Sequence, residues 1–99
     1  MSGFELTKSA QTDLKSIAKF TQERWGVRQR NTYLREIDQV FHSLAKNPVM
    51  GRACDEVRNG YRKFPHGSHV IYYKQDDRDV LLVVRILHMT MDVDLQVGA

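Results

Sequence analysis

Apolar side chains recur at helical spacing over the first half of the chain. The first stripe predicts an amphipathic helix that is capped at Thr7 or Ser9 and stopped by Gly26. A second, wider stripe predicts a helix over residues 28–46, which ends there because the residue before Pro48 is disfavoured in a helix. The connection between the two helices is short, and it therefore favours an antiparallel helical hairpin.

The last third of the chain has the shorter spacing of β-structure. Four strands are predicted, at residues 4–7, 61–64, 69–74 and 80–87. A turn at Pro65-His66-Gly67 joins the middle two strands, and Asn59-Gly60 is the competing hairpin turn. The predicted fold is α+β, with the N-terminal antiparallel helical hairpin packed on one face of a small, mainly antiparallel sheet. The whole chain, residues 1–99, is expected to form a single domain.

The predicted strand over residues 80–87 is apolar at nearly every position. An antiparallel strand with one wet face should alternate apolar and polar residues, so this strand must be covered on both faces. The helical hairpin supplies one cover. The second cover is either another protein or the C-terminal tail, which offers only Met91, Val93, Leu95 and Val97. The partner is the favoured explanation.

Composition and charge describe the setting of the protein more than its activity. At 99 residues, 41% hydrophobic and 27% charged, the chain has the composition of a soluble globular domain. It has no apolar run near the roughly 20 residues of a membrane span, and residues 1–5 do not resemble a signal peptide. With a single cysteine, Cys54, it suits a reducing compartment. A cytoplasmic protein without a membrane partner is expected. The net charge of +3 favours an anionic partner only weakly, because acidic residues are interleaved with basic ones.

The chain carries none of the common cofactor or metal motifs, so neither a cofactor nor a metal is predicted. His69 and His88 lie at predicted strand ends, where neighbouring strands converge. With Arg62 and Arg85 they would form a basic site for a phosphate, as metal-free ribonuclease chemistry requires. A structural role for the two histidines is the favoured alternative. Trp25 ends the first helical stripe, and its position there favours core packing.

Several short motifs follow one another in order along residues 6–94. The first half carries Asp13-Leu14, Ile17-Ala18, Trp25-Gly26, Tyr33-Leu34 and Asn47-Pro48. The second half carries Asp55-Glu56-Val57-Arg58, Gly60-Tyr61-Arg62-Lys63-Phe64, Gly67-Ser68-His69-Val70-Ile71-Tyr72-Tyr73 and Arg85-Ile86-Leu87-His88-Met89. Each motif is short, but their order and spacing together resemble the ParE toxins of bacterial toxin–antitoxin modules.

The resemblance implies the RelE/ParE fold and a function that composition does not supply. ParE-like toxins inhibit DNA gyrase by trapping it on cleaved DNA, and they do so as poisons rather than catalysts. A ParD-like antitoxin holds them inactive by wrapping their hydrophobic surface. The resemblance therefore implies two partners, a ParD-like antitoxin and DNA gyrase, and no sequence-specific binding of nucleic acid. It would also explain the excess of apolar strand surface.

The candidate contact residues for antitoxin or gyrase lie on both halves of the chain. They are Trp25, Tyr33, Arg62, Tyr72, Arg85, His88, Met91 and Asp92. Residues 85–92 are the candidate gyrase contact. The alternative is a ribosome-dependent mRNA endonuclease of the RelE type, which would use Arg62, Lys63, Arg85 and His88. Two departures count against it: Val70 follows His69 where RelE-type toxins have an arginine, and Met89 follows His88 where they have a tyrosine.

Overall fold

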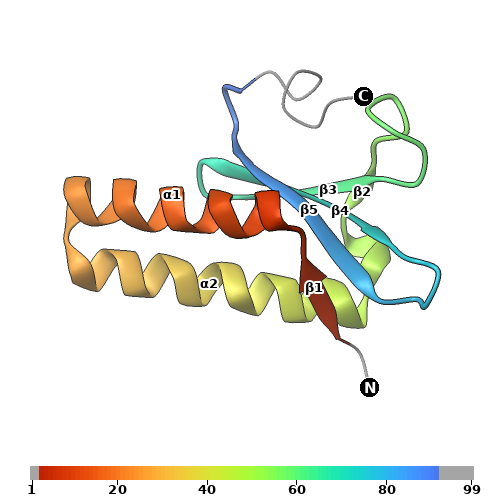
Figure 1. The fold of residues 1–99 in the computed structure, drawn as a ribbon, viewed down its shortest axis with the longest axis horizontal. Helices are drawn as coiled ribbons and strands as arrows, with labels where there is room; N and C mark the ends of the chain where they lie inside the picture. Colours follow the sequence, from red (N-terminus) through yellow and green to blue (C-terminus); the bar gives the residue numbers. More distant parts are fainter. Residues whose placement is uncertain (1–2, 92–99) are drawn as a thin grey trace.

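Two antiparallel helices lie on one face of a five-stranded sheet in the computed structural model, which describes residues 3–91 (Figure 1). The elements in chain order are β1 (Phe4–Leu6), α1 (Lys8–Trp25), α2 (Val27–Lys46), the 3-10 helix η1 (Pro48–Met50), β2 (Arg52–Ala53), β3 (Arg62–His66), β4 (His69–Gln75) and β5 (Leu81–His88). The predicted α+β class and helical hairpin are confirmed. None of the described helices is long and apolar enough to cross a membrane.

The ends of α1 are fixed by the two residues that the sequence indicates. The Thr7 hydroxyl oxygen accepts a hydrogen bond from the Ala10 amide at 3.0 Å, which caps the helix. The same hydroxyl donates to the Val84 carbonyl at 2.7 Å, so the cap also ties α1 to β5. At the other end Gly26 has a φ of 93°, a backbone conformation that glycine tolerates best, and it lets the chain reverse into α2.

The strand order in the sheet is β1-β5-β4-β3-β2. The β3–β4 hairpin closes at Gly67-Ser68, where His66 pairs with His69. A turn thus joins the two predicted strands, but Pro65 and His66, predicted in the turn, belong to β3, and Asn59-Gly60 lies in a loop. β1 pairs with β5 in parallel, while every other pairing among the described strands is antiparallel. β1 and β5 are therefore neighbours although the whole helical hairpin separates them in the sequence.

A bulge explains part of the apolar run in β5. Tyr72 pairs with Arg85 but Tyr73 pairs with Val83, so Val84 is an extra residue on β5. The shift places Val83 and Ile86, three positions apart, in the same core beneath the helices. That core also holds Ala10, Ile17, Ile37, Phe41, Leu44, Ile71, Tyr73 and Leu81.

The second face of β4 and β5 is covered in part by the chain itself. Cys54, Tyr72 and Leu87 form a second buried cluster, and Val57 and Tyr61 pack against it. These residues place the loop between β2 and β3 over the outer side of the sheet. The prediction that a partner or the tail must cover the second face of the strand over residues 80–87 was therefore wrong for Leu87, because sequence spacing does not show where a loop folds back. The tail residues from 92 onward lie outside the described part of the chain.

Candidate functional site

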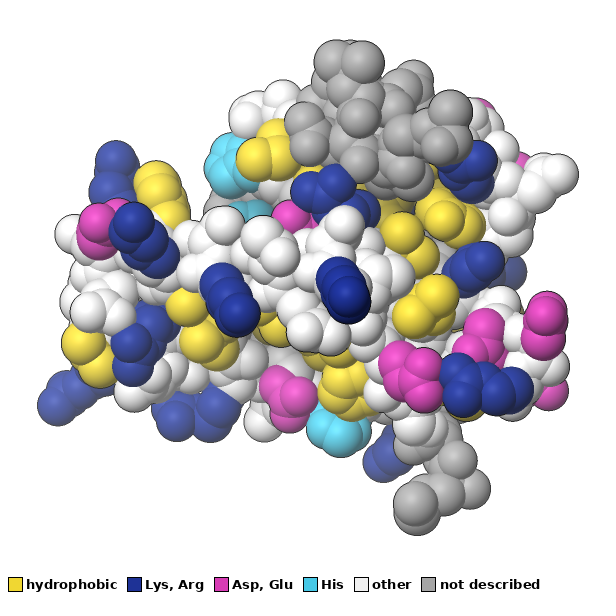
Figure 2. Space-filling view, in the orientation of Figure 1, with side chains coloured by type: hydrophobic (Ala, Val, Ile, Leu, Met, Phe, Trp, Pro, Cys, Tyr) yellow, Lys and Arg dark blue, Asp and Glu magenta, His cyan; other side chains and the backbone are white. Residues whose placement is uncertain are grey.

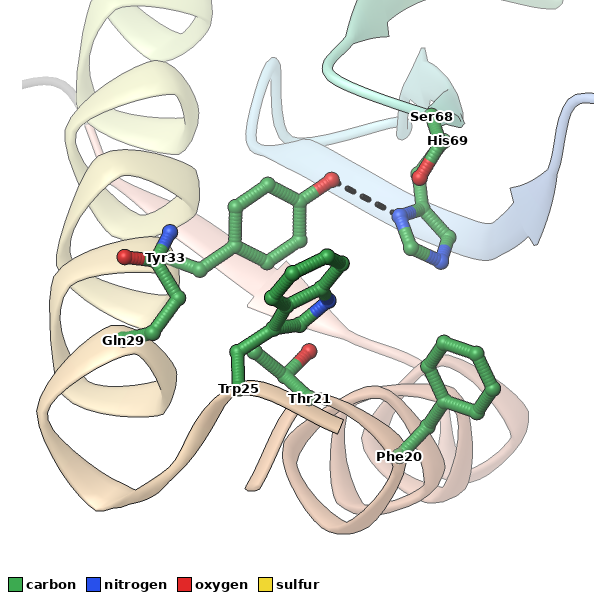
Figure 3. Close-up of a pocket in the computed structure, with 7 residues that line it drawn as sticks. All are labelled: Phe20, Thr21, Trp25, Gln29, Tyr33, Ser68 and His69. Atoms are coloured by element: carbon green, nitrogen blue, oxygen red, sulfur yellow. Dashed lines mark hydrogen bonds between the residues drawn. The ribbon is translucent and has the colours of Figure 1, made fainter. Parts of the chain in front are cut away.

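Two adjoining pockets lie where the open side of the helical hairpin meets the β3–β4 turn and the end of β5. The first, of about 390 Å³ and called here the hairpin pocket, is lined by Phe20, Thr21, Trp25, Gln29, Tyr33, Ser68 and His69. Figure 3 shows these residues coming from α1, α2 and the β3–β4 turn. The second, of about 480 Å³ and called the strand-end pocket, is lined by Asp13, Ser16, Ile17, Phe20, His69, Ile86, His88, Thr90 and Met91. Phe20 and His69 belong to both pockets, so the two form one continuous concave surface.

The rim of this surface exposes large apolar side chains. Phe20 is 55% exposed, Trp25 67% and Met91 51%. The prediction that Trp25 packs in the core was wrong, because α1 extends past the edge of the sheet and its last turn lies beyond the strands (Figure 1). Exposed apolar groups gathered around a pocket are typical of an interaction site. The surface is therefore a candidate for binding a partner.

A hydrogen-bonded group of aromatic and histidine side chains forms the floor of the hairpin pocket. The Tyr33 hydroxyl lies 2.7 Å from His69 Nδ1 and 3.1 Å from the His66 carbonyl oxygen. His66 Nε2 lies 3.3 Å from Glu36 Oε1, which ties the turn to α2. The His69 and His88 rings meet edge to face with centroids 5.5 Å apart. The strand-end histidines thus converge as predicted, and Tyr33 joins them.

Burial lowers the pKa of His69, and the neighbouring His88 and His66 charges lower it further against the opposing effect of Asp13. Below about pH 6.5 the unfolded chain therefore binds more protons than the folded one. We expect the free energy of unfolding to fall as the pH drops from 6.5 through the lowered pKa of His69.

Urea denaturation between pH 7.5 and 5 measures this dependence. His69→Gln should flatten the profile between pH 6.5 and 5. His42→Gln is the matched control, because His42 is exposed on α2. A profile that stays equally steep in His69→Gln would contradict the assignment.

The structure brings some of the candidate contact residues together and separates others. Trp25 and Tyr33 line the hairpin pocket, and His88 and Met91 line the strand-end pocket. Arg85 borders the strand-end pocket, because it is bonded to Asp13 in its wall at 2.8 and 2.9 Å.

Arg62 and Tyr72 are not part of this surface. The Arg62 guanidinium donates to the Gly51 carbonyl at 2.8 Å, and Tyr72 is only 7% exposed within the second cluster. As a free-surface contact Tyr72 is thus a wrong choice, since the loop over the outer face of the sheet buries it. Asp92 lies outside the described residues.

The basic site postulated for ribonuclease chemistry is not assembled in this arrangement. Arg62 and His66 stand at opposite ends of β3, which places Arg62 roughly 13 Å from the histidine end of the sheet. Arg85 is held by Asp13. Neither pocket is lined by a lysine or arginine of the described chain, so neither lining supplies a cation for a phosphate beside the histidines. Among residues 3–91, no cluster of His, Cys, Asp or Glu has three members placed to hold a metal ion.

Sequence reasoning missed Phe20 and Asp13 as parts of this surface. Phe20 lies off the predicted apolar stripe of α1, and an apolar residue off the stripe is a usable sign of exposure. Asp13 appeared only within a motif, and its partner Arg85 is 72 residues away. No local pattern predicts a pair at that separation.

Comparison with known proteins places this fold and surface in a class. A family model for the ParE toxin of type II toxin–antitoxin systems, parDE, matches residues 4–93. Toxin ParE1 of Mycobacterium tuberculosis is 46% identical over 93 residues, which cover 94% of this chain and 95% of that toxin. Toxin ParE1 of Caulobacter vibrioides is 34% identical over 98 residues, covering 99% and 100% of the two chains. The class is therefore that of type II toxin–antitoxin toxins.

Within that class, the chain belongs to the ParE toxin family. A solved structure of the chromosomal ParDE system from P. aeruginosa matches with a TM-score of 0.74 at 16% identity, covering 89% of this chain and 96% of that one. The RelBE2 toxin–antitoxin complex from Mycobacterium tuberculosis matches with a TM-score of 0.64 at 17% identity, covering 88% and 96%. At these identities the likeness shows the fold alone, and it confirms the predicted RelE/ParE fold.

Proposed function

We propose that this ParE-family protein inhibits DNA gyrase, and so DNA replication, as a poison rather than a catalyst. The observation that carries the proposal is the match to the ParE family, which runs from residue 4 to residue 93. The pockets support a non-catalytic mode, because no lysine or arginine of the described chain lines them and Arg85, at the border of the strand-end pocket, is paired with Asp13. Action on gyrase places the protein in the cytoplasm.

An assay of plasmid supercoiling with purified gyrase and ATP tests this proposal. The protein should inhibit supercoiling in proportion to its concentration. A parallel reaction with translating ribosomes and mRNA tests the RelE-type alternative. Cleaved mRNA together with unimpaired supercoiling would overturn the proposal in favour of the ribonuclease.

We further propose that a ParD-like antitoxin neutralises the protein by seating an apolar segment in the strand-end pocket. Phe20 and Met91 are both about half exposed there, beside the buried Ile17 and Ile86. When a partner's side chain excludes water from an apolar pocket with exposed apolar walls, the buried apolar surface contributes favourably to the free energy of binding. The antitoxin is expected to be encoded directly beside this gene.

Phe20→Glu tests whether the antitoxin binds in the strand-end pocket. A carboxylate in the centre of an apolar contact must be desolvated, so the affinity for the antitoxin should fall by about 100-fold, or roughly 2.7 kcal/mol. Isothermal titration calorimetry of the two purified proteins measures the change.

Val49→Glu is the matched control for that measurement. Val49 is 67% exposed on η1, away from both pockets, and the same substitution there should leave affinity within about twofold. Equal losses in the two variants would show that the strand-end pocket is not the seat.

A further inference from the structure

The tip of the helical hairpin, residues 19–31, carries a clear excess of positive charge. The tip carries four basic side chains and one acidic one; they are Lys19, Arg24, Arg28, Arg30 and Glu23. Taking these from the 15 basic and 12 acidic residues of the whole chain leaves eleven of each sign. The tip therefore has a net charge of +3, as large as that of the whole chain. Figure 2 shows dark-blue basic side chains around this end of the molecule.

The positive charges of the tip are not neutralised by ion pairs. None of the ion pairs among residues 3–91 includes a basic residue of the tip. Among the described residues, the Arg30 guanidinium donates hydrogen bonds to the neutral side-chain amides of Gln22 and Asn31. Its Nε and Nη2 lie 3.0 and 2.9 Å from Asn31 Oδ1. Arg24 stacks over the Phe20 ring at 5.5 Å, an arrangement that keeps its full charge.

Two of these charges stand where they do not stabilise their helix, although Arg24 lies favourably in the last turn of α1. The first turn of α2 holds no acidic residue, although acidic groups stabilise this end of a helix. Arg28 and Arg30 stand there instead, where the helix dipole disfavours a cation. Two arginines at an unfavourable helix end, in a segment with one acidic residue against four basic ones, fit an anionic ligand from outside the chain.

Trp25 stands among these arginines and is 67% exposed. An exposed aromatic ring surrounded by cations suits a nucleic-acid strand, whose bases stack on the ring while its phosphates meet the cations. The carboxylates of an acidic peptide would satisfy the charges, but they do not themselves stack on the flat face of the indole. The combination therefore favours nucleic acid over an acidic protein segment.

We propose that the hairpin tip binds a DNA strand without regard to sequence, through Arg24, Arg28 and Arg30 on phosphates and Trp25 on a base. The choice of DNA rests on the proposed function, because gyrase would hold the toxin next to DNA. The tip would then add a second contact to the complex of toxin, gyrase and DNA. The strand-end pocket remains available to another partner.

Trp25 is the only tryptophan in the chain, so its fluorescence reports directly on the tip. The probe is a 12-nucleotide thymidine oligonucleotide, titrated without gyrase at several salt concentrations. Quenching should saturate with a dissociation constant of about 10⁻⁴ to 10⁻⁶ M near physiological salt. Three phosphate contacts on a single strand predict a slope of about −2 for log K against log salt.

The double variant Arg24→Gln/Arg28→Gln should flatten that slope to about −0.7 and weaken binding on the order of tenfold at low salt. Lys46→Gln/Arg52→Gln is the matched control, because it removes two exposed positive charges far from the tip. The control should bind like the unaltered protein. Circular dichroism confirms that both variants are folded, which is expected because glutamine and arginine have similar helix propensities.

Three results would overturn the inference: no quenching at low salt, equal weakening in both double variants, or equal quenching by polyglutamate. The last would assign the tip to an acidic protein segment. The titration contains no gyrase, so its outcome is independent of the supercoiling assay. Inhibited supercoiling without DNA binding would refute this inference alone, and DNA binding without inhibition would refute the proposed gyrase target alone.

Discussion

Gly51→Ala should be among the most damaging substitutions in this protein, although it adds a single methyl group. A Cβ at this position would lie 2.1 Å from the Tyr73 hydroxyl oxygen and 2.7 Å from two ring carbons. Tyr73 is fully buried and cannot move aside. We expect a loss of about 3 kcal/mol in the free energy of unfolding, at the upper end of the usual cost of overpacking. For a domain of this size the melting temperature should fall by more than about 10 °C.

The hydroxyl of Tyr73 makes this site stiff as well as crowded. It accepts a hydrogen bond from the Gly51 amide at 2.9 Å and donates one to the Pro48 carbonyl, so it holds η1 against the sheet. Burial raises the pKa of Tyr73, which keeps the hydroxyl protonated as a donor. A ring that yields to the new methyl group would break both bonds.

Gly3→Ala is the matched control, because nothing lies within 4 Å of a Cβ at Gly3. Thermal melting of the two variants should differ sharply, with Gly3→Ala within about 0.5 kcal/mol of the unaltered protein. In the double variant Gly51→Ala/Tyr73→Phe, removing the hydroxyl should recover part of the loss. An unchanged melting temperature in Gly51→Ala would contradict the close approach.

Asp13→Ala should produce the second large loss. The Asp13 carboxylate accepts hydrogen bonds from Arg85 Nε at 2.8 Å, from Arg85 Nη2 at 2.9 Å and from the Ile86 amide at 2.9 Å. The two side chains are only 13% and 19% exposed, so water replaces the lost bonds poorly. Taking the carboxylate away should cost about 2–4 kcal/mol, measured by urea denaturation.

Glu5→Ala is the matched control for this ion pair. Glu5 pairs with Arg78 at 2.9 Å, but both side chains are more than half exposed, so its loss should cost less than about 1 kcal/mol. Changing Arg85 to Met in the Asp13→Ala background should restore stability, because the desolvated charge is then gone. If Asp13→Ala is no more harmful than Glu5→Ala, Asp13 does not anchor α1 to β5.

Elements that depend on local sequence were predictable, and pairings between distant segments were not. Thr7, Gly26 and Pro48 mark helix ends through their own backbone chemistry, so both helices were correctly bounded within one or two residues. The parallel pairing of β1 with β5 joins residues 77 positions apart, as between Phe4 and Leu81, and no local signal encodes it. The bulge at Val84 likewise depends on the register of two strands.

The sequence predicts which site residues lie together at strand ends, but it does not predict which side chains are exposed to solvent. His69 and His88 converge because both end neighbouring strands, and strand ends can be located from the sequence. Trp25 was assigned to the core from helical periodicity, which does not show how far a helix extends past the sheet. Tyr72 was named among the contact residues, and its burial depends on a loop whose path the sequence does not show. Periodicity thus favoured burial for Trp25, which is exposed, while Tyr72, named as a contact, is buried.

The most direct test of a gyrase poison is the cleaved complex itself. The purified protein is incubated with gyrase, ATP and supercoiled plasmid, and the reaction is stopped with detergent and treated with protease. The account predicts linear plasmid that carried covalently linked gyrase before the protease step, increasing with the amount of toxin. Plasmid that remains intact and normally supercoiled, with protein shown to be folded by circular dichroism, would contradict it.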